Sequence, residues 1–380
     1  TMLGKITGLP GVSLAPAAGA QGEFVGSLIT RAWIHDNGEL DVRNEMLVPD
    51  SAHGTNPATA SLAGFKVAKV PSNDEGLVDV EMVKKFSSKR TAGMMLTNPN
   101  TLGIFEKKIQ EISGIVHDAG GLMYYDGANM NALLGKARPG EMGFDIAHLN
   151  LHKTFTTPHG GGGPGSGPVC VTKDLAQYLP VPIIESRSNM YVLNHNLSKS
   201  IGRVKGFLGN AAILYRAYLY IRLMGSDGLT EVSSQAVLAS NYLLKKLDQL
   251  YFTTTHDQRT RRMHEFVVSL KNLKEKLPYP ALEIGKSMLD NGVHSPTVYF
   301  PLTVNEALMV EPTETESLEE LDQYANSLNS IALNASTNPE ELKLRPTESS
   351  IGRLDEARAS RISTMKLNWR PRSKNESHEA

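Results

Sequence analysis

An aspartate and a lysine each follow a short apolar run of the sequence. Asp126 ends the run "LMYYD", and Lys153 follows "IAHLNLH". A lysine amine that has lost its proton is a nucleophile and condenses with an aldehyde cofactor such as pyridoxal phosphate (PLP). PLP needs a carboxylate at its ring nitrogen, because the protonated ring is the electron sink. Most lysines are solvated and most Asp-Gly pairs are turns, so neither residue alone indicates a site, but the two together favour PLP chemistry.

Strand-like runs alternate with helix-like segments between residues 45 and 170, which predicts a mostly parallel sheet with helices on both faces. One helix is expected over residues 104–120, with Gly120 as its C-cap. Open parallel sheets bind ligands at the carboxyl ends of their strands. The polar residues after the runs are therefore expected to converge on one edge: Asp50, Ser51, His53, Thr97, Asn98, Asn100, Asp126, Asn129, His152 and Lys153.

Residues 201–250 are strongly helical in pattern and are expected to join two domains. We predict a large α/β domain over residues 1–235 and a smaller α+β domain with a polar tail over residues 236–380. The strands of the small domain are expected in "HEFVVSL", "PTVYFPL" and "ALMVEP".

Two further stretches could complete a cofactor site. "PAAGAQGEFVGSLITRAW" places Ala18, Gly19 and Ala20 ahead of a helix, and the amides of a helix N-terminus bind phosphate well; a tight turn into a buried helix explains the same pattern. His53 in "PDSAHGTNPA" could stack on the cofactor ring, although a hydrogen-bonded loop histidine would look the same.

Other chemistries lack their motifs. A nucleoside triphosphate loop is absent, because Ala137 replaces the hydroxyl residue of "LLGKA" and Pro280 the first glycine of the "EIGKS" stretch. "HEFVV" has Val268 in place of a second histidine, and in a strand His148 and His152 would lie roughly 13 Å apart, so no metal site is predicted. A serine nucleophile elbow is also missing.

The composition narrows the functional class further. The 380 residues carry 39 basic and 40 acidic side chains, which gives no field to attract nucleic acid. No apolar run approaches the ~20 residues that span a bilayer, so no membrane role is predicted. Cys170 is the single cysteine, which excludes an internal disulfide and fits a reducing compartment. The chain begins at Thr1 without a cationic and apolar leader.

Longer motifs carry a specific resemblance. The runs "PAAGAQGE", "VPDSAHGTNPA", "MLTNPNTLGIFE", "YYDGANMNALLGKARPGEMGFD" and "HLNLHKTFTTPHGGGGPGSGP" resemble the P-protein family of the glycine cleavage system, in its two-subunit form. "SIGRVKGFLGN", "HEFVVSLK", "HSPTVYFPL" and "MVEPTETES" extend this likeness over nearly all of residues 1–350. The resemblance implies roughly a hundred further residues ahead of "ITGLPGVSLAP", more than a loop-sized trim.

The resemblance also implies a fold and a site. The fold would be that of fold-type-I PLP enzymes, with a large domain, a small domain and an active site shared across a subunit interface. Lys153 would hold PLP covalently as a Schiff base and Asp126 would contact the pyridine nitrogen. Ala128 and His53 would flank the ring. The phosphate would be held by Gly19, Ala20 and Gln21, with His152 nearby, and Thr101 would contact the phenolic oxygen.

The activity implied is the decarboxylation of glycine, with release of CO2 and transfer of the aminomethyl group to the lipoyl arm of H-protein. The implied partner is glycine dehydrogenase subunit 1, in a hetero-oligomer such as a heterotetramer, and the implied compartment is the cytoplasm. Lys153 marks this chain as the catalytic subunit. Another fold-type-I amino-acid decarboxylase and a non-catalytic partner subunit remain alternatives.

The glycine-rich stretch over residues 160–167 admits two interpretations. It could be a mobile lid at the lipoyl entrance, because its residues have little side-chain bulk. It could equally be a rigid turn, fixed by Pro158, Pro164 and Pro168, that lets another backbone approach closely.

Overall fold

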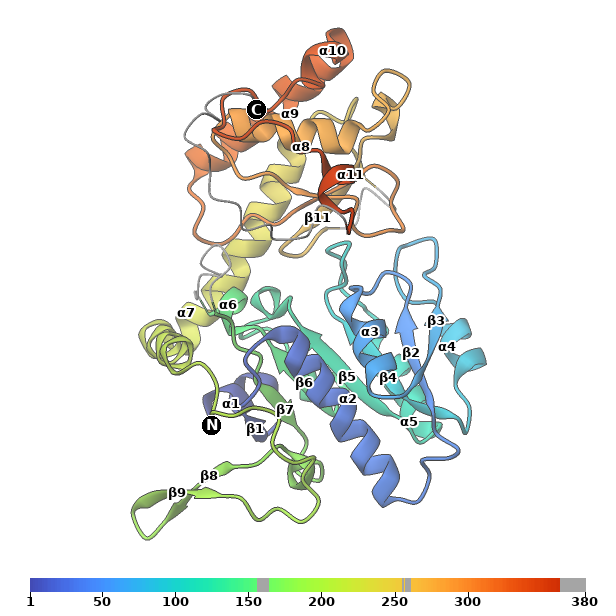
Figure 1. The fold of residues 1–380 in the computed structure, drawn as a ribbon, viewed down its shortest axis with the longest axis vertical. Helices are drawn as coiled ribbons and strands as arrows, with labels where there is room; N and C mark the ends of the chain where they lie inside the picture. The colour runs from blue at the N-terminus through green and yellow to red at the C-terminus, as the bar shows by residue number, and fades with distance from the viewer. Residues whose placement is uncertain (156–163, 255, 257–260, 363–380) are drawn as a thin grey trace.

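The computed structural model describes residues 1–155, 164–254, 256 and 261–362. The large domain is built on a seven-stranded sheet of order β1-β7-β6-β5-β4-β2-β3 (Figure 1). Strands β3, β2, β4, β5 and β6 run parallel, whereas β7 is antiparallel to both β6 and β1. The strands are β1 Gly11–Ser13, β2 Glu45–Pro49, β3 Lys66–Val70, β4 Thr91–Thr97, β5 Leu122–Gly127, β6 Ile146–Leu149 and β7 Val169–Val171.

Helices cover both faces of this sheet. Helices α2 (Gly19–Asp36) and α3 (Thr55–Leu62) pack on one face, and α4 (Val80–Phe86), α5 (Ile109–Asp118) and the start of α7 (Ala211–Lys246) pack on the other. Adjacent residues of β5 face opposite sides of the sheet. Tyr124 therefore lies in the core beneath α2 and α3, and Tyr125 in the core beneath α4, α5 and α7. The near-continuous apolar runs of the sequence are therefore strands buried on both faces, as predicted.

The small domain has a four-stranded antiparallel sheet of order β10-β11-β13-β12. Its core lies between this sheet and helices α8 and α9, and a capping box of Ser317 and Glu320 begins α9. The elements are β10 Thr253–Thr254, β11 Phe266–Ser269, α8 Pro280–Asp290, β12 Thr297–Val298, β13 Ala307–Val310, α9 Leu318–Thr337 and α10 Pro339–Leu342.

Helix α7 joins the two domains and is kinked at Gly225, whose φ of 63° is left-handed. Its buried residues up to Val232 belong to the core of the large domain, and those from Ala239 onward belong to the core of the small domain. The domain division after residue 235 stays a prediction. The remaining elements are α1 Met2–Thr7, α6 Leu151–Thr154, the hairpin of β8 Ile183–Arg187 and β9 Met190–Asn194, and α11 Glu356–Ala359.

Two predicted helices are shorter than expected. Helix α5 begins at Ile109 rather than at residue 104, because the Asn100 carboxamide oxygen accepts the Ile104 N–H at 3.1 Å and closes a loop there. Residues 201–210 are not helical, since Gly202 and Gly209 have φ values of 88° and 92°. Among the described helices, none has the length and apolar character needed to cross a bilayer.

Candidate active site

The carboxyl ends of β2, β4, β5 and β6 meet at one edge of the large sheet, because these strands run parallel. Not every polar residue after these strands faces a ligand. Asp50 accepts a hydrogen bond from Ser72 at 2.5 Å, and the side chains of Asn98 and Asn100 accept backbone N–H groups of their own loop. These three side chains shape the surrounding loops.

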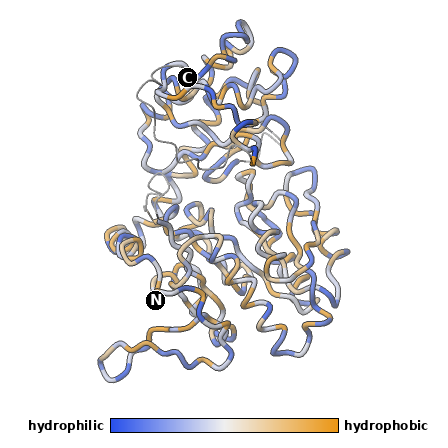
Figure 2. The backbone as a smooth tube through the Cα atoms, in the orientation of Figure 1, coloured by the Kyte–Doolittle hydropathy of each residue, from blue (hydrophilic) through white to orange (hydrophobic). Residues whose placement is uncertain are grey.

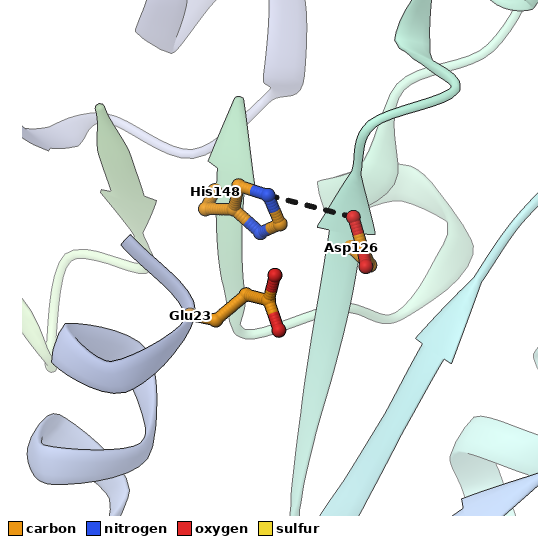
Figure 3. A group of neighbouring side chains, drawn as sticks. All are labelled: Glu23, Asp126 and His148. Carbon is orange, nitrogen blue, oxygen red and sulfur yellow. Dashed lines mark ion pairs between the residues drawn. The ribbon is translucent and has the colours of Figure 1, made fainter. Parts of the chain in front are cut away.

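Asp126 lies at the end of β5 and is 3% exposed. The Ala128 N–H donates to its Oδ1 at 3.0 Å, and the Asn56 amide of α3 donates to its Oδ2 at 3.2 Å. His148 of β6, its partner in the strand register, places Nε2 3.4 Å from Oδ1 (Figure 3). The carboxylate is thus held rigidly at the sheet edge, as a contact to a cofactor ring requires.

Lys153 is exposed and lies on α6, a single helical turn that follows β6. The sequence predicted continued strand alternation through residue 152, but the N–H groups of Lys153 and Thr154 both donate to the Asn150 carbonyl and start a helical turn. Burial raises the pKa of both Glu23 and Glu265, and the positive charge of Lys153 partly opposes this rise at each carboxyl group. Its ammonium group therefore acts on buried carboxyl groups from both domains.

The N-terminus of α2 offers unused backbone donors. Its N-cap, Ala18, has no side chain to cap the helix, and the first helical bond runs from Gly22 N–H to the Ala18 carbonyl. Within the described residues, the amides of Gly19, Ala20 and Gln21 have no acceptor. Amides of this kind are the usual phosphate site of a helix. The Gln21 side chain is already committed, because it bonds to the Ala17 N–H and the Val204 carbonyl.

His53 follows β2 in an exposed loop. Its Nδ1 lies 2.8 Å from the Thr55 hydroxyl, and its ring meets the edge of Phe300 of the small domain with centroids 5.5 Å apart. His152 accepts the Ser166 N–H on Nδ1 at 3.1 Å, and Thr101 donates its hydroxyl to the Ser51 carbonyl at 2.6 Å. The last two side chains are thus oriented by backbone partners.

The glycine-rich stretch is only partly described, because residues 160–163 lie outside the described residues. In the described part, Gly167 lies against the Ala18 carbonyl and the Gly19 N–H so closely that a Cβ at Gly167 would overlap them. Gly167 also donates its N–H to the Pro16 carbonyl at 3.1 Å. This end of the stretch is a close backbone approach that braces the N-terminus of α2.

Sequence reasoning missed a buried group beside Asp126. Glu23 of α2 is 5% exposed, and burial together with the charge of Asp126 raises its pKa to about 8. Tyr124 places its hydroxyl 2.6 Å from Nδ1 of His148. The strand alternation carried a signal for this group, because it puts Tyr124 and Asp126 on one face of β5. The residue spacing singles out His148 only as a possible metal ligand.

A second missed group comes from the small domain. His264 and Glu265, at the start of β11, lie with Glu311, which follows β13. The Asn129 amide donates to Glu265 at 3.0 Å, and Asn131 donates to Glu311 at 3.1 Å, so these bonds tie the small domain to the loop after β5. Burial raises the pKa of Glu265 well above its usual range. The three acidic and imidazole groups are close enough to share a cation.

Buried polar atoms without partners concentrate at this edge of the sheet. Buried polar groups are nearly always hydrogen-bonded, so such a concentration fits a polar ligand. The donor set also suits PLP, with a carboxylate for the ring nitrogen, amides for the phosphate and a primary amine. In the described residues the unpartnered atoms here belong to Glu23, Asn56, Thr97, Asn131, His148, Asn150, Thr154, Ser166 and His264.

Several curated relatives share one name. The chain is 55% identical over 361 residues to "Probable glycine dehydrogenase (decarboxylating) subunit 2" of Pyrococcus furiosus, a match that covers 94% of this chain and 72% of that protein. It is 49% identical over 376 residues to the protein of the same name in Coxiella burnetii, covering 98% of this chain and 76% of the relative. A family model described as "Glycine dehydrogenase, C-terminal domain" matches residues 232–349.

Solved structures support the predicted fold class. A glycine decarboxylase (P-protein) of the glycine cleavage system matches with a TM-score of 0.72 at 20% identity, covering 87% of this chain and 74% of that one. A cysteine desulfurase from Thermococcus onnurineus matches with a TM-score of 0.66 at 14% identity, covering 88% and 82%. The α/β fold of fold-type-I PLP enzymes is confirmed. On the identity it shares with its relatives, the chain belongs to the family of glycine dehydrogenase (decarboxylating) subunit 2.

Proposed function

We propose that this chain is the catalytic subunit of a glycine-cleaving enzyme. It decarboxylates glycine, releases CO2 and passes the aminomethyl group to the lipoyl arm of H-protein. The observation that carries the proposal is the placement of Lys153 and the rigidly held carboxylate of Asp126 at neighbouring strand ends, close to the unpaired amides of α2. The shared family name supports the same activity.

Each residue then has a defined task toward PLP. Lys153 would hold the cofactor covalently, Asp126 would contact the ring nitrogen, and Ala128 and His53 would flank the ring. The bound cofactor supplies an electron sink that stabilises the carbanion left by CO2. The Gly19, Ala20 and Gln21 amides would hold the phosphate, with His152 nearby, and Thr101 would contact the phenolic oxygen.

The small domain supplies the other wall of the proposed site. Glu265 and His264 are buried and lie within the electrostatic reach of Lys153. We propose that they exclude water from the substrate and hold the Asn129 loop in place through the 3.0 Å bond to Glu265. A dry site strengthens the charge interactions that orient glycine.

We also propose assembly with a first subunit, into a hetero-oligomer such as a heterotetramer located in the cytoplasm. The hairpin of β8 and β9 projects from the large domain (Figure 1), and Figure 2 shows hydrophobic stretches within it. Exposed apolar side chains on this hairpin and on the start of α7 support a protein partner. They are Ile184, Met190, Tyr191 and Leu193 on the hairpin, and Tyr215, Tyr218, Leu219 and Leu223 on α7.

The experiment compares wild type with Lys153→Ala after reconstitution with PLP, with and without the co-expressed first subunit. The variant should lose the visible absorbance of the covalently held cofactor. It should also lose all glycine-dependent CO2 exchange, measured in the presence of H-protein. Lys107→Ala, at an exposed lysine, is the matched control and should keep both. Persistence of the absorbance in Lys153→Ala would refute the assignment.

The alternatives give different results in the same assay. CO2 release that does not depend on lipoylated H-protein would indicate a simple amino-acid decarboxylase. A wild-type chain that binds no PLP and shows no spectral change with glycine, even beside the first subunit, would indicate a non-catalytic subunit.

A further inference from the structure

Two buried carboxyl groups face each other beneath the candidate active site. Glu23 lies in the first turns of α2 and Asp126 at the end of β5, and they are 5% and 3% exposed. One oxygen of each and one ring nitrogen of His148 lie within 4.8 Å of one another (Figure 3). Two carboxylates this close and this dry cannot both carry a negative charge.

The hydrogen-bond donors decide which group carries the charge. Asp126 receives the Ala128 N–H and the Asn56 amide, and Nε2 of His148 faces it as well. Glu23 has one neighbour on Oε1, the Thr55 hydroxyl at 2.9 Å, and Oε2 has none within the described residues. Donors stabilise the ionised form of a carboxyl group. The charge therefore resides on Asp126 and the proton on Glu23.

The surroundings of Glu23 agree with this distribution. Burial raises the pKa of Glu23 most, Asp126 raises it further, and Thr55 and Lys153 lower it, with a result of about 8. The groups that face Glu23 are Asp126 and Tyr124 of β5, His148 of β6, Lys153 of α6, and Thr55 with His53 at the start of α3.

Thr55 connects Glu23 to His53. The Thr55 Oγ1 lies 2.9 Å from Glu23 Oε1 and 2.8 Å from His53 Nδ1, and one hydroxyl has a single hydrogen to donate. While Glu23 keeps its proton on Oε1, the carboxyl group donates to Thr55 and Thr55 donates to His53; an ionised Glu23 accepts the Thr55 hydroxyl instead. The Thr55 backbone N–H also points at Nδ1, at 3.3 Å. Two donors aimed at Nδ1 leave the imidazole proton on Nε2.

We propose that Glu23 is a positioning residue that fixes the tautomer of His53 through Thr55. The proposal rests on the proposed function, in which His53 flanks the cofactor ring. With Nδ1 occupied as an acceptor, the imidazole keeps its hydrogen on Nε2. Loss of the Glu23 proton reverses the chain, because Thr55 then donates to the carboxylate and His53 must supply a hydrogen from Nδ1.

The test reads the tautomer directly, by the nitrogen chemical shifts of His53 in protein labelled with 15N-histidine and assigned with His53→Gln. Cofactor-free protein is used first, so the result does not depend on activity. Wild type should carry the proton on Nε2 at pH 7.5, above the ordinary pKa of an imidazole, and shift toward Nδ1–H above about pH 8, where Glu23 ionises. Glu23→Gln should keep Nε2–H up to pH 9, because its amide still donates to Thr55. Thr55→Val should keep Nε2–H throughout, because the backbone N–H of residue 55 still points at Nδ1 and no hydroxyl remains to respond to the charge of Glu23.

A binding measurement gives the second readout. Wild-type affinity for PLP should fall about tenfold between pH 7 and pH 9, because Glu23 loses its proton in this range. Glu23→Gln has no proton to lose at this position, so its affinity should not show this tenfold fall. Glu106→Gln is the matched control, since Glu106 is a buried carboxyl group that accepts the Val78 N–H outside the site. It should leave both readouts unchanged.

The outcomes separate this inference from the proposed function. An Nδ1–H proton on His53 at pH 7.5, or a shift toward Nδ1–H above pH 8 that persists in Thr55→Val, would overturn the role of Glu23 even if glycine is still cleaved. The expected tautomers in a protein that does not cleave glycine would leave the hydrogen-bond chain in place and overturn the proposed function alone.

Discussion

The clearest stability prediction concerns the substitution Glu23→Gln. The folded protein raises the pKa of Glu23 from 4.5 to about 8, so the folded state binds this proton more tightly than the unfolded chain does. The stabilisation is complete below pH 4.5, where both states are protonated, and it is lost as the pH rises toward 8. Above pH 8 both states are ionised and the loss is complete. Glutamine is neutral throughout and removes this dependence.

The magnitude follows from the same two pKa values. Between pH 5 and pH 7.5 the wild type should lose about 3 kcal/mol of unfolding free energy through Glu23, since each pH unit between the two pKa values costs ~1.4 kcal/mol. Glu23 is 5% exposed, so solvent screening reduces this little. For a domain of this size ~0.5 kcal/mol corresponds to one degree, which makes the difference about 6 °C in melting temperature.

The assay is thermal unfolding of wild type and variant, followed by circular dichroism from pH 5 to pH 8.5 without cofactor. Glu106→Gln is again the matched control, because burial raises the pKa of Glu106 only to about 7. Below pH 7, the melting temperature of both variants should fall less steeply with pH than that of wild type. Between pH 7 and pH 8, only Glu23→Gln should still show this shallower fall. Parallel curves for wild type and Glu23→Gln would refute the raised pKa and the charge distribution built on it.

Two further predictions concern the packing and the cofactor contact. Gly26→Ala should destabilise the protein by about 1–3 kcal/mol in urea unfolding, because the added methyl group overlaps the Tyr124 ring. Gly114→Ala, where the methyl group meets nothing within 4 Å, should stabilise its helix by roughly 0.5–1 kcal/mol instead; equal effects would contradict the packing argument. Asp126→Asn should weaken PLP binding about 10- to 100-fold in a fluorescence titration, since a hydrogen bond to a charged group contributes ~1.5–3 kcal/mol.

The parallel sheet could be predicted from the sequence because its strands are short apolar runs ended by polar residues. The pairing of Asp126 with His148 follows from the same regularity, since neighbouring parallel strands bring such positions side by side. The contact of Glu23 with Thr55 could not be predicted. It depends on how α2 lies against α3, and the packing distance of two helices leaves no trace in residue spacing.

The small-domain group shows a second limit. In the sequence, "HEFVV" has Val268 where a zinc-binding motif would have its second histidine, which argues against a metal site of that kind. The carboxylate of Glu311 joins His264 and Glu265 because β13 pairs antiparallel with β11, which brings residues far apart in sequence together. The predicted start of a helix at Ile104 was wrong for a local reason. The Asn100 side chain accepts the Ile104 N–H and closes a loop there, so the helix begins only at Ile109.

The antiparallel edge of the large sheet also sets an order on folding during synthesis. Strand β1 pairs with β7, so Gly11 finds its partner only at Val171, and β7 in turn needs β6. Contacts between residues this far apart form late, because a long loop must close first. The ribosome therefore releases β1 well before β7, its partner strand. Until residue 171 has emerged, β1 has no strand to pair with, so a nascent chain leaves this edge of the sheet unfinished and open to wrong contacts.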